Sequence, residues 1–277
     1  MGSTKLLARF PKLNAAYQGY RECKRRLRPP VKNLLGFWFV GNKLMQSGNF
    51  EPEETGVVLE LLKDADVLVN VGANIGYYCC IALQQDKHVI AFEPMPGNLE
   101  YLMRNIALNG MEASIEIFPM ALGSRCGIAK IFGGGTGASL IEGWAGQSEK
   151  QFTLVPMSTL DTVLSNRMQG IRCLVVVDIE GVELSMLQSA TKLLSNDPRP
   201  IWLIEISVNE HQPDGIVINP NLVKTFEIMR EAGYLAFTAN GESREILLPE
   251  VQQVAATGRD TLQTHNFVFR SSADKLP

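Results

Sequence analysis

The sequence lacks the features of membrane-spanning and secreted proteins. No apolar run approaches the roughly 20 residues of a transmembrane helix, and residues 34–40 come nearest. The N-terminus has neither the apolar stretch nor the small-residue cleavage site of a signal peptide. Leu6 stands where the myristoylation pattern after Gly2 needs serine or threonine. We therefore expect a cytoplasmic protein.

Cysteine pairs with the spacing of zinc or redox sites are also missing. The chain has five scattered cysteines and no C-x-x-C pair: Cys23, Cys79, Cys80, Cys126 and Cys173. We expect reduced thiols, most of them buried in helices and strands. The sequence identifies no metal ligands, although a divalent cation held by carboxylates stays open as a cofactor.

Basic residues are scarce outside the N-terminal segment. Residues 1–32 carry nine lysines and arginines and one acidic residue, whereas residues 33–277 carry 17 basic and 28 acidic residues, a net charge of −11. A region with this net negative charge is poorly suited to bind the phosphates of a nucleic acid, so we expect no nucleic-acid partner.

The basic N-terminal segment predicts a separate helical extension over residues 1–52. Apolar residues recur at three- and four-residue steps from Leu13 to Leu27, which indicates an amphipathic helix ended by Pro29 and Pro30. Its basic face could rest on an anionic membrane surface. Alternatively, the helix packs on the rest of the protein and leaves its charged face in water.

From residue 53 to the C-terminus, apolar strands alternate with helices. Strands are expected at residues 67–71, 88–92, 114–119, 173–178 and 201–207, and a final pair at 234–238 and 265–269 encloses a polar loop around Gly258. Helices are expected at 53–63, 75–84, 97–109, 160–165, 183–194 and 221–232. This order predicts an α/β domain with a mostly parallel sheet covered by helices on both faces. Two strand-like pieces, 128–132 and 152–156, flank a glycine-rich insert at 133–150.

The most informative stretch is a strand–loop–strand unit. The strand at 67–71 ends in Gly72, Asn74 and Gly76, and the next strand ends in Glu93, 21 residues after Gly72. Glycines let backbone approach a nucleoside cofactor, and a glutamate can accept hydrogen bonds from both ribose hydroxyls. A dinucleotide fingerprint would have glycine in place of Asn74, so the spacing favours a cofactor without phosphates, such as S-adenosylmethionine. An ordinary tight turn is the alternative interpretation.

Acidic residues gather after the strand at 173–178. Asp178, Glu180 and Glu183 lie within six residues, at the end of a buried strand and at the edge of the sheet where the cofactor is expected. Glu205, in the next strand, could join them. They could remove a proton from a hydroxyl, bind a cation or contact the cofactor. Alternatively, these residues have structural roles: Glu180, with Gly181, forms a turn, and Glu183 occupies the first turn of the next helix. His211 follows the next strand and is the one histidine placed to act as a base, unless it is simply an exposed loop residue.

Together these motifs resemble the FkbM family of S-adenosylmethionine-dependent methyltransferases. The resemblance covers residues 53–270 and is carried, in order, by residues 69–78, 91–94, 121–123, 159–161 and 178–183. It implies a Rossmann-like class I methyltransferase fold, whose seven-stranded, mostly parallel sheet has an antiparallel last strand. It also implies O-methylation of a hydroxyl on a sugar, glycan or other small natural product.

The resemblance further implies where the cofactor binds. The methionine end of the cofactor would lie against Gly72, Asn74 and Gly76. Its ribose would bind Glu93, and its adenine would lie against Met120 and Ala121. The candidate catalytic residues are Asp178, Glu180 and His211.

Two positions depart from the family pattern. Asn70 replaces an acid often seen before the first glycine, and Val176 replaces a lysine two residues before the aspartate. A non-catalytic S-adenosylmethionine-binding module therefore stays open, as does an RNA or tRNA methyltransferase, although no Asn-Pro-Pro-Tyr-type motif for nitrogen methylation occurs. The sequence does not indicate the oligomeric state.

Overall fold

A computed structural model describes residues 28–148, 150–164 and 166–272. The chain divides into two compact units at Phe50 and Glu51. The amphipathic helix predicted for residues 13–27, its membrane contact and Cys23 lie outside the described residues. In the first unit, β1 (Val31–Lys32) pairs antiparallel with β2 (Trp38–Phe39), and α3 (Lys43–Ser47) follows.

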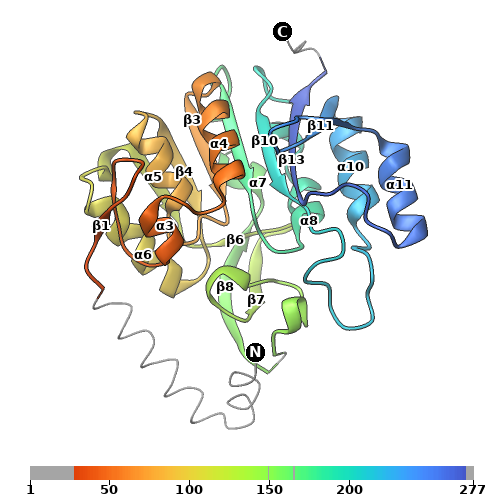
Figure 1. Cartoon of the computed structure of the whole chain (residues 1–277), viewed down its shortest axis with the longest axis horizontal. Coiled ribbons are helices and arrows are strands. Elements are labelled where there is room, and N and C mark those ends of the chain that lie inside the picture. The colour runs from red at the N-terminus through yellow and green to blue at the C-terminus, as the bar shows by residue number, and fades with distance from the viewer. Residues whose placement is uncertain (1–27, 149, 165, 273–277) are drawn as a thin grey trace. The chain divides into compact units, whose positions relative to one another are not determined.

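The second unit is built on an eight-stranded sheet, ordered β12-β11-β13-β10-β9-β3-β4-β5 (Figure 1). Its strands are β3 (Val67–Val71), β4 (His88–Phe92), β5 (Ile115–Phe118), β9 (Cys173–Val177), β10 (Ile201–Glu205), β11 (Tyr234–Thr238), β12 (Glu245–Ile246) and β13 (Asn266–Ser271). The neighbouring strands β5, β4, β3, β9 and β10 pair in parallel, whereas β13 lies antiparallel between β10 and β11. The Rossmann-like class I fold expected from the sequence is confirmed, with the two-residue β12 as an additional edge strand.

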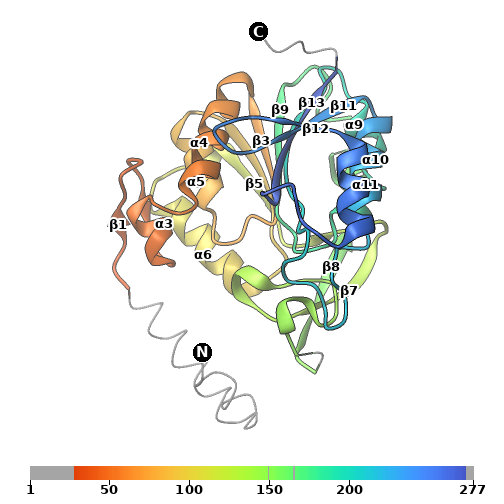
Figure 2. The same cartoon turned by 45° about the vertical axis from the view of Figure 1, so that its right-hand side comes forward.

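Helices cover both faces of this sheet (Figure 2). One face carries α4 (Pro52–Leu61), α5 (Tyr77–Gln84) and α6 (Pro96–Ala107), and the other carries α7 (Leu160–Leu164), α8 (Glu183–Leu187), α9 (Thr191–Leu194), α10 (Leu222–Glu231) and α11 (Leu248–Thr257). Successive side chains of β3 point to opposite faces of the sheet, which explains the two layers of helices. Val67, Val69 and Val71 belong to the core under α7–α11, whereas the side chain of Asn70 reaches Cys79 in α5.

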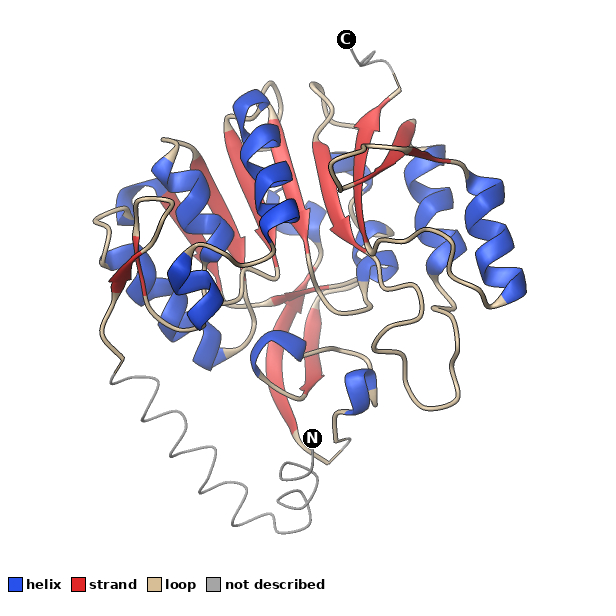
Figure 3. Ribbon diagram, in the orientation of Figure 1, coloured by secondary structure: helices blue, strands red, loops and turns tan. Residues whose placement is uncertain are grey.

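A small second sheet lies beyond the carboxyl ends of the parallel strands (Figure 3). It consists of β6 (Ala121–Leu122), β8 (Phe152–Ser158) and β7 (Gly127–Phe132), in that order. The glycine-rich insert connects β7 to β8 and contains two single turns of 3₁₀ helix, η3 (Gly135–Gly137) and η4 (Trp144–Gly146). The small sheet therefore carries this insert over the edge at which the sequence places the cofactor.

The prediction of a polar loop between the last two strands was wrong. That segment contains β12 and the ten-residue helix α11. Val251 and Val254 are buried on one side of α11, and Gly258 ends the helix with a left-handed φ of 69°. The helix predicted over residues 183–194 is also interrupted, because α8 ends at Leu187 and α9 begins at Thr191.

The described cysteines are all free thiols. Cys79, Cys80 and Cys173 are buried, as expected, but Cys126 is exposed. Within the described part of the chain, no helix has the length and apolar character needed to cross a bilayer.

Candidate active site

The segments after β3, β4, β5 and β9 surround a cavity with a volume of about 560 Å³. Seven of the nine candidate site residues line this cavity: Gly72, Asn74, Glu93, Met120, Ala121, Asp178 and Glu180. Gly76 and His211 are not in its lining. The structure thus brings together residues from four separate loops, as right-handed crossovers between parallel strands require.

Gly72 and Gly76 make room for protein atoms. Both have left-handed φ angles, 86° and 87°. A Cβ on Gly72 would overlap the backbone carbonyl oxygen of Asp178, and a Cβ on Gly76 would overlap Cδ1 of Leu102. Gly72 therefore lets the ends of β3 and β9 approach closely, while Gly76 lets α5 begin against α6. The sequence predicted that both glycines approach a ligand; Gly72 lines the cavity, whereas Gly76 does not.

Glu93, in the loop after β4, binds the loop after β3 through a hydrogen bond. Its side chain is only 4% exposed. One carboxylate oxygen accepts from the backbone N–H of Asn74 at 2.8 Å, and the other accepts from Met95 N at 2.8 Å and Asn98 Nδ2 at 3.2 Å. Burial raises the pKa of Glu93 to about 7, although these three hydrogen bonds act in the opposite direction. Each carboxylate oxygen has two lone pairs, so Oε2 of Glu93, which accepts only from Asn74, can still accept one hydrogen bond from a ligand.

Asp178 lies at the centre of a group of carboxylates. Burial, together with the negative charges of Glu205 and Glu180, raises its pKa well above the ordinary value. The pKa of Glu205, at the end of β10, is raised in the same way by burial and by Glu180 and Glu54. These side chains therefore hold protons more strongly than isolated carboxylates do, and a nearby positive charge would favour their ionised forms.

Glu183 has a structural role. It is 3% exposed, and its Oε1 accepts a hydrogen bond from the backbone N–H of Gly181 at 2.8 Å. It is the first residue of α8, as the helix-start alternative proposed. Burial raises the pKa of Glu183 to about 7.

Glu180 connects the glycine-rich insert to His211. Its Oε2 accepts a hydrogen bond from Trp144 Nε1 at 2.7 Å and lies 3.6 Å from His211 Nδ1. The backbone of Ala145 also donates to the carbonyl oxygen of His211 at 2.7 Å. Glu180 and His211 both have left-handed φ angles, 55° and 60°, an uncommon backbone conformation for residues other than glycine. Such strain is typical of functional sites.

The arrangement offers no metal site among the described residues. No group of three or more histidine, cysteine, aspartate and glutamate side chains in those ranges is placed to hold an ion. The divalent cation left open by the sequence therefore has no support here.

The sequence model of the methyltransferase FkbM domain matches residues 70–236, more than half of the chain. The chain belongs to this family. The family is one of S-adenosylmethionine-dependent methyltransferases, and the match spans the first glycine loop, Glu93 and the acidic segment at 178–183.

Several solved structures are similar to this FkbM methyltransferase. The methyltransferase FkbM from Methylobacillus flagellatus KT is 21% identical, with a TM-score of 0.37 and with 51% of this chain and 33% of that protein covered. A putative O-methyltransferase from Klebsiella pneumoniae is 11% identical over 79% of each chain, with a TM-score of 0.41. A TehB-like SAM-dependent methyltransferase from Corynebacterium glutamicum is 10% identical over 82% of this chain and 90% of its own, with a TM-score of 0.42. The chain thus spans about a third of the Methylobacillus protein, and no curated protein matches it.

The cavity lining fits S-adenosylmethionine better than a phosphate-bearing nucleotide. Glu93, Asp178 and Glu180 line it, and no lysine or arginine of the described residues does. Carboxylates repel phosphates and attract the positive charges of a sulfonium and an amino group. Met120 and Leu122 add apolar wall suited to a purine ring.

The two departures of this FkbM methyltransferase from the family pattern are both buried. Asn70 is 2% exposed and its Nδ2 donates to Cys79 Sγ at 3.4 Å, on the side of α5. Val176 is also 2% exposed, in the middle of β9.

Sequence reasoning missed the contacts that assemble the site. Trp144 was visible in the glycine-rich insert, but no pattern indicated that its indole N–H would reach Glu180. Glu51 and Glu54 were also missed. The carboxyl group of Glu54 is buried and receives a hydrogen bond from Asn266 Nδ2 at 3.0 Å, across 212 residues of sequence.

Substitution of Trp144 by phenylalanine tests the connection between the insert and Glu180. Phenylalanine lacks the far edge of the indole that packs against Gly181, and Glu180 would lose its 2.7 Å hydrogen bond. We expect the free energy of unfolding to fall by about 1–3 kcal/mol, because a hydrogen bond and part of this packing are lost from a shielded position. Denaturant titration measures the change. Trp38→Phe at a 45% exposed tryptophan is the control, and an equal effect in both variants would contradict the role of Trp144.

Proposed function

We propose that this FkbM methyltransferase transfers the methyl group of S-adenosylmethionine to a hydroxyl oxygen of a sugar, glycan or other small natural product. The observation that carries the proposal is the pair formed by Glu180 and His211 beside the cofactor cavity. A hydroxyl becomes a good nucleophile only as it loses its proton, so its enzyme needs a nearby proton acceptor. A histidine next to a carboxylate is suited to that role near neutral pH.

The cofactor would be held by the loops around the cavity. Glu93 would accept a hydrogen bond from a ribose hydroxyl through Oε2, and Met120 and Ala121 would lie along the adenine. Gly72 and Asn74 would face the methionine end, near Asp178. Gly76 would contribute indirectly, because its close packing on Leu102 fixes the start of α5.

Proton removal would be the main chemical task of the protein. S-adenosylmethionine, when bound, supplies a methyl group that is already activated for attack by oxygen. As the new bond to oxygen forms, the hydroxyl proton would pass to the Nε2 of His211. Glu180 would orient the ring through Nδ1 and stabilise the imidazolium, while Trp144 holds Glu180 in place.

Label transfer from isotopically labelled S-adenosylmethionine to a panel of sugars, glycans and polyketides tests this function. We expect label in O-methyl groups. His211→Ala should lower turnover by about 10²–10⁴-fold while changing cofactor affinity by less than about twofold, since general-base catalysis contributes that much to rate. His88→Ala, at the amino end of β4 and thus on the opposite edge of the sheet, is the matched control. Label on nitrogen products alone would contradict the proposal, and so would full turnover in His211→Ala.

A further inference from the structure

The position of the Glu180 carboxylate depends on an uncommon backbone conformation. Glu180 has a left-handed φ of 55°, and Gly181 follows with a φ of 97°. In this turn the Oε2 of Glu180 lies 3.6 Å from His211 Nδ1. A backbone that relaxed to an ordinary conformation would change the direction of the Cα–Cβ bond and move the carboxylate away from the imidazole. The pairing of the two side chains therefore requires contacts that hold the turn.

Ser139, in the glycine-rich insert, holds this turn through its hydroxyl group. It is 1% exposed; its Oγ donates to the backbone carbonyl oxygen of Glu180 at 2.6 Å and accepts from the backbone N–H of Ile141 at 2.9 Å. One hydroxyl group can make both bonds, because it has one hydrogen to donate and two lone pairs. At the next residue, the N–H of Gly181 donates to Glu183 Oε1 at 2.8 Å. The insert thus holds the turn at Glu180, and the first residue of α8 holds it at Gly181.

The backbone of Ser139 is fixed without its hydroxyl group. Its N–H donates to the carbonyl oxygen of Phe132 at 3.1 Å, and its carbonyl oxygen accepts from the N–H of Phe132 at 2.8 Å. These two bonds join the residue to the end of β7. Removal of the hydroxyl group should therefore release the turn at Glu180 without releasing the insert from the small sheet.

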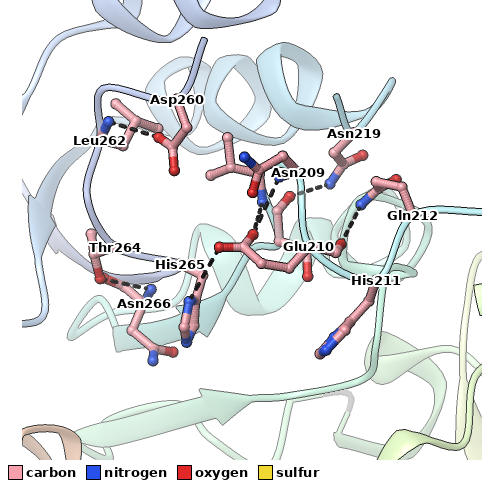
Figure 4. Close-up of polar contacts among 12 residues, drawn as sticks. Asn209, Glu210, His211, Gln212, Asn219, Asp260, Leu262, Thr264, His265 and Asn266 are labelled. Carbon is pink, nitrogen blue, oxygen red and sulfur yellow. Dashed lines mark hydrogen bonds and ion pairs between the residues drawn. The ribbon is translucent and has the colours of Figure 1, made fainter. Parts of the chain in front are cut away.

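His211, in contrast, is held mainly within its own loop (Figure 4). Glu210 Oε2 accepts from the backbone N–H groups of Val208 and Asn209 at 3.1 and 3.2 Å. Gln212 Nε2 donates to the backbone carbonyl oxygen of Glu210 at 3.1 Å. Both sequence neighbours of the histidine therefore make contacts inside the loop. The carboxylate that would orient the imidazole depends instead on a distant segment.

The insert contacts the turn at its main chain and at its side chain. Ser139 binds the backbone of Glu180, and Trp144 binds its carboxylate. A Cβ on Gly181 would lie 2.5 Å from Trp144 Cζ3 and 2.8 Å from Ile141 Cδ1, so the turn also packs tightly against the insert. Trp144 acts on the end of the glutamate side chain, whereas Ser139 acts on the backbone from which that side chain starts.

We propose that Ser139 is a positioning residue for the reaction: its hydroxyl group holds Glu180 in the left-handed conformation from which the carboxylate orients His211. The role of His211 as proton acceptor rests on the proposed function. Without the hydroxyl group, the carbonyl oxygen of Glu180 and the N–H of Ile141 would both lose this partner, and the turn would relax. Only the fraction of molecules that kept the turn would then have an oriented imidazole.

The kinetics of Ser139→Ala test the positioning role. We expect kcat to fall at least about tenfold, with the KM for S-adenosylmethionine changed less than about twofold, because Ser139 does not line the cofactor cavity. Ser139→Thr keeps a hydroxyl group and should retain kcat within about threefold. In the control Thr225→Val, a hydroxyl group that is also 1% exposed and donates to the Asn221 carbonyl oxygen at 2.9 Å is lost from α10, and kcat should not change. Full kcat in Ser139→Ala would overturn the proposal, and so would an equal loss in Ser139→Thr or Thr225→Val.

NMR separates the positioning role from the proposed function, since it needs no substrate. The indole N–H of Trp144 donates to Glu180 Oε2, so its exchange with solvent reports whether the carboxylate stays in place. We expect this N–H to exchange at least about tenfold faster in Ser139→Ala, whereas the indole N–H of Trp202, buried in β10, should keep its rate. Unchanged exchange at Trp144 would overturn the proposal. A wild-type protein that methylates no hydroxyl would contradict the proposed function and leave the exchange result intact.

Discussion

Replacing Gly72 with alanine is expected to unfold the second unit or to lower its free energy of unfolding by more than about 4 kcal/mol. The added Cβ would overlap the carbonyl oxygen of Asp178 and lie 2.9 Å from its carbonyl carbon, and both are backbone atoms of the neighbouring strand end. Neither can rotate away as a side chain can. The left-handed φ of 86° adds a cost of about 1–2 kcal/mol for any residue with a Cβ. Relief would require β3 and β9 to separate in the middle of the sheet.

The same variant should lose cofactor binding. The displaced loop contains the Asn74 N–H that donates to Glu93, so the first two loops of the cavity would move apart. Circular dichroism and thermal melting measure folding, and calorimetry with S-adenosylmethionine measures binding. Gly56→Ala in α4 is the control. Its Cβ would meet nothing within 4 Å, and alanine should stabilise the helix by about 0.5–1 kcal/mol. A Gly72→Ala protein with normal melting and binding would contradict the close approach of the two strands.

The sheet could be predicted because its signals are local. Three parallel strands, β3, β4 and β9, are short apolar runs followed by a glycine or an acidic residue, and parallel strands place their carboxyl ends at one edge. The sequence therefore brought Gly72, Glu93 and Asp178 to one edge without any three-dimensional information. Helix α11 was missed because polar residues surround its two buried valines, Val251 and Val254, and conceal the helical period.

The rest of the site depends on contacts between distant segments. Asn266 meets Glu54 only because β13 inserts between β10 and β11, which brings the last strand near the start of α4. No property of either residue indicates that pairing. Trp144 and Glu180 likewise meet because the insert folds back from the small sheet. Sequence patterns could place the proposed cofactor loops, but they could not place these contacts between distant segments.

Replacing Glu54 with glutamine is expected to stabilise the ligand-free protein at pH 8 and to leave its stability at pH 5 nearly unchanged. The pKa of Glu54 rises from its ordinary value of 4.5 to about 8 on folding, because the buried carboxylate lies near Glu51 and Asp178. The folded state therefore binds more protons than the unfolded state between these values. Stability is fully present below pH 4.5 and is lost as the pH rises towards 8. The pKa values of Glu93 and Glu183, both raised to about 7, add to the same loss between pH 4.5 and 7.

Glutamine removes this titration while keeping an oxygen for Asn266. Its Oε1 can still accept the 3.0 Å hydrogen bond from Asn266 Nδ2, so the packing of β13 against α4 is preserved. We expect a gain on the order of 4 kcal/mol at pH 8, since each pKa unit between 4.5 and about 8 is worth about 1.4 kcal/mol; denaturant titration at pH 5 and pH 8 measures it. Glu112→Gln, in an exposed 3₁₀ turn, should show no gain at either pH. A Glu54→Gln protein that is no more stable than wild type at pH 8 would contradict the raised pKa.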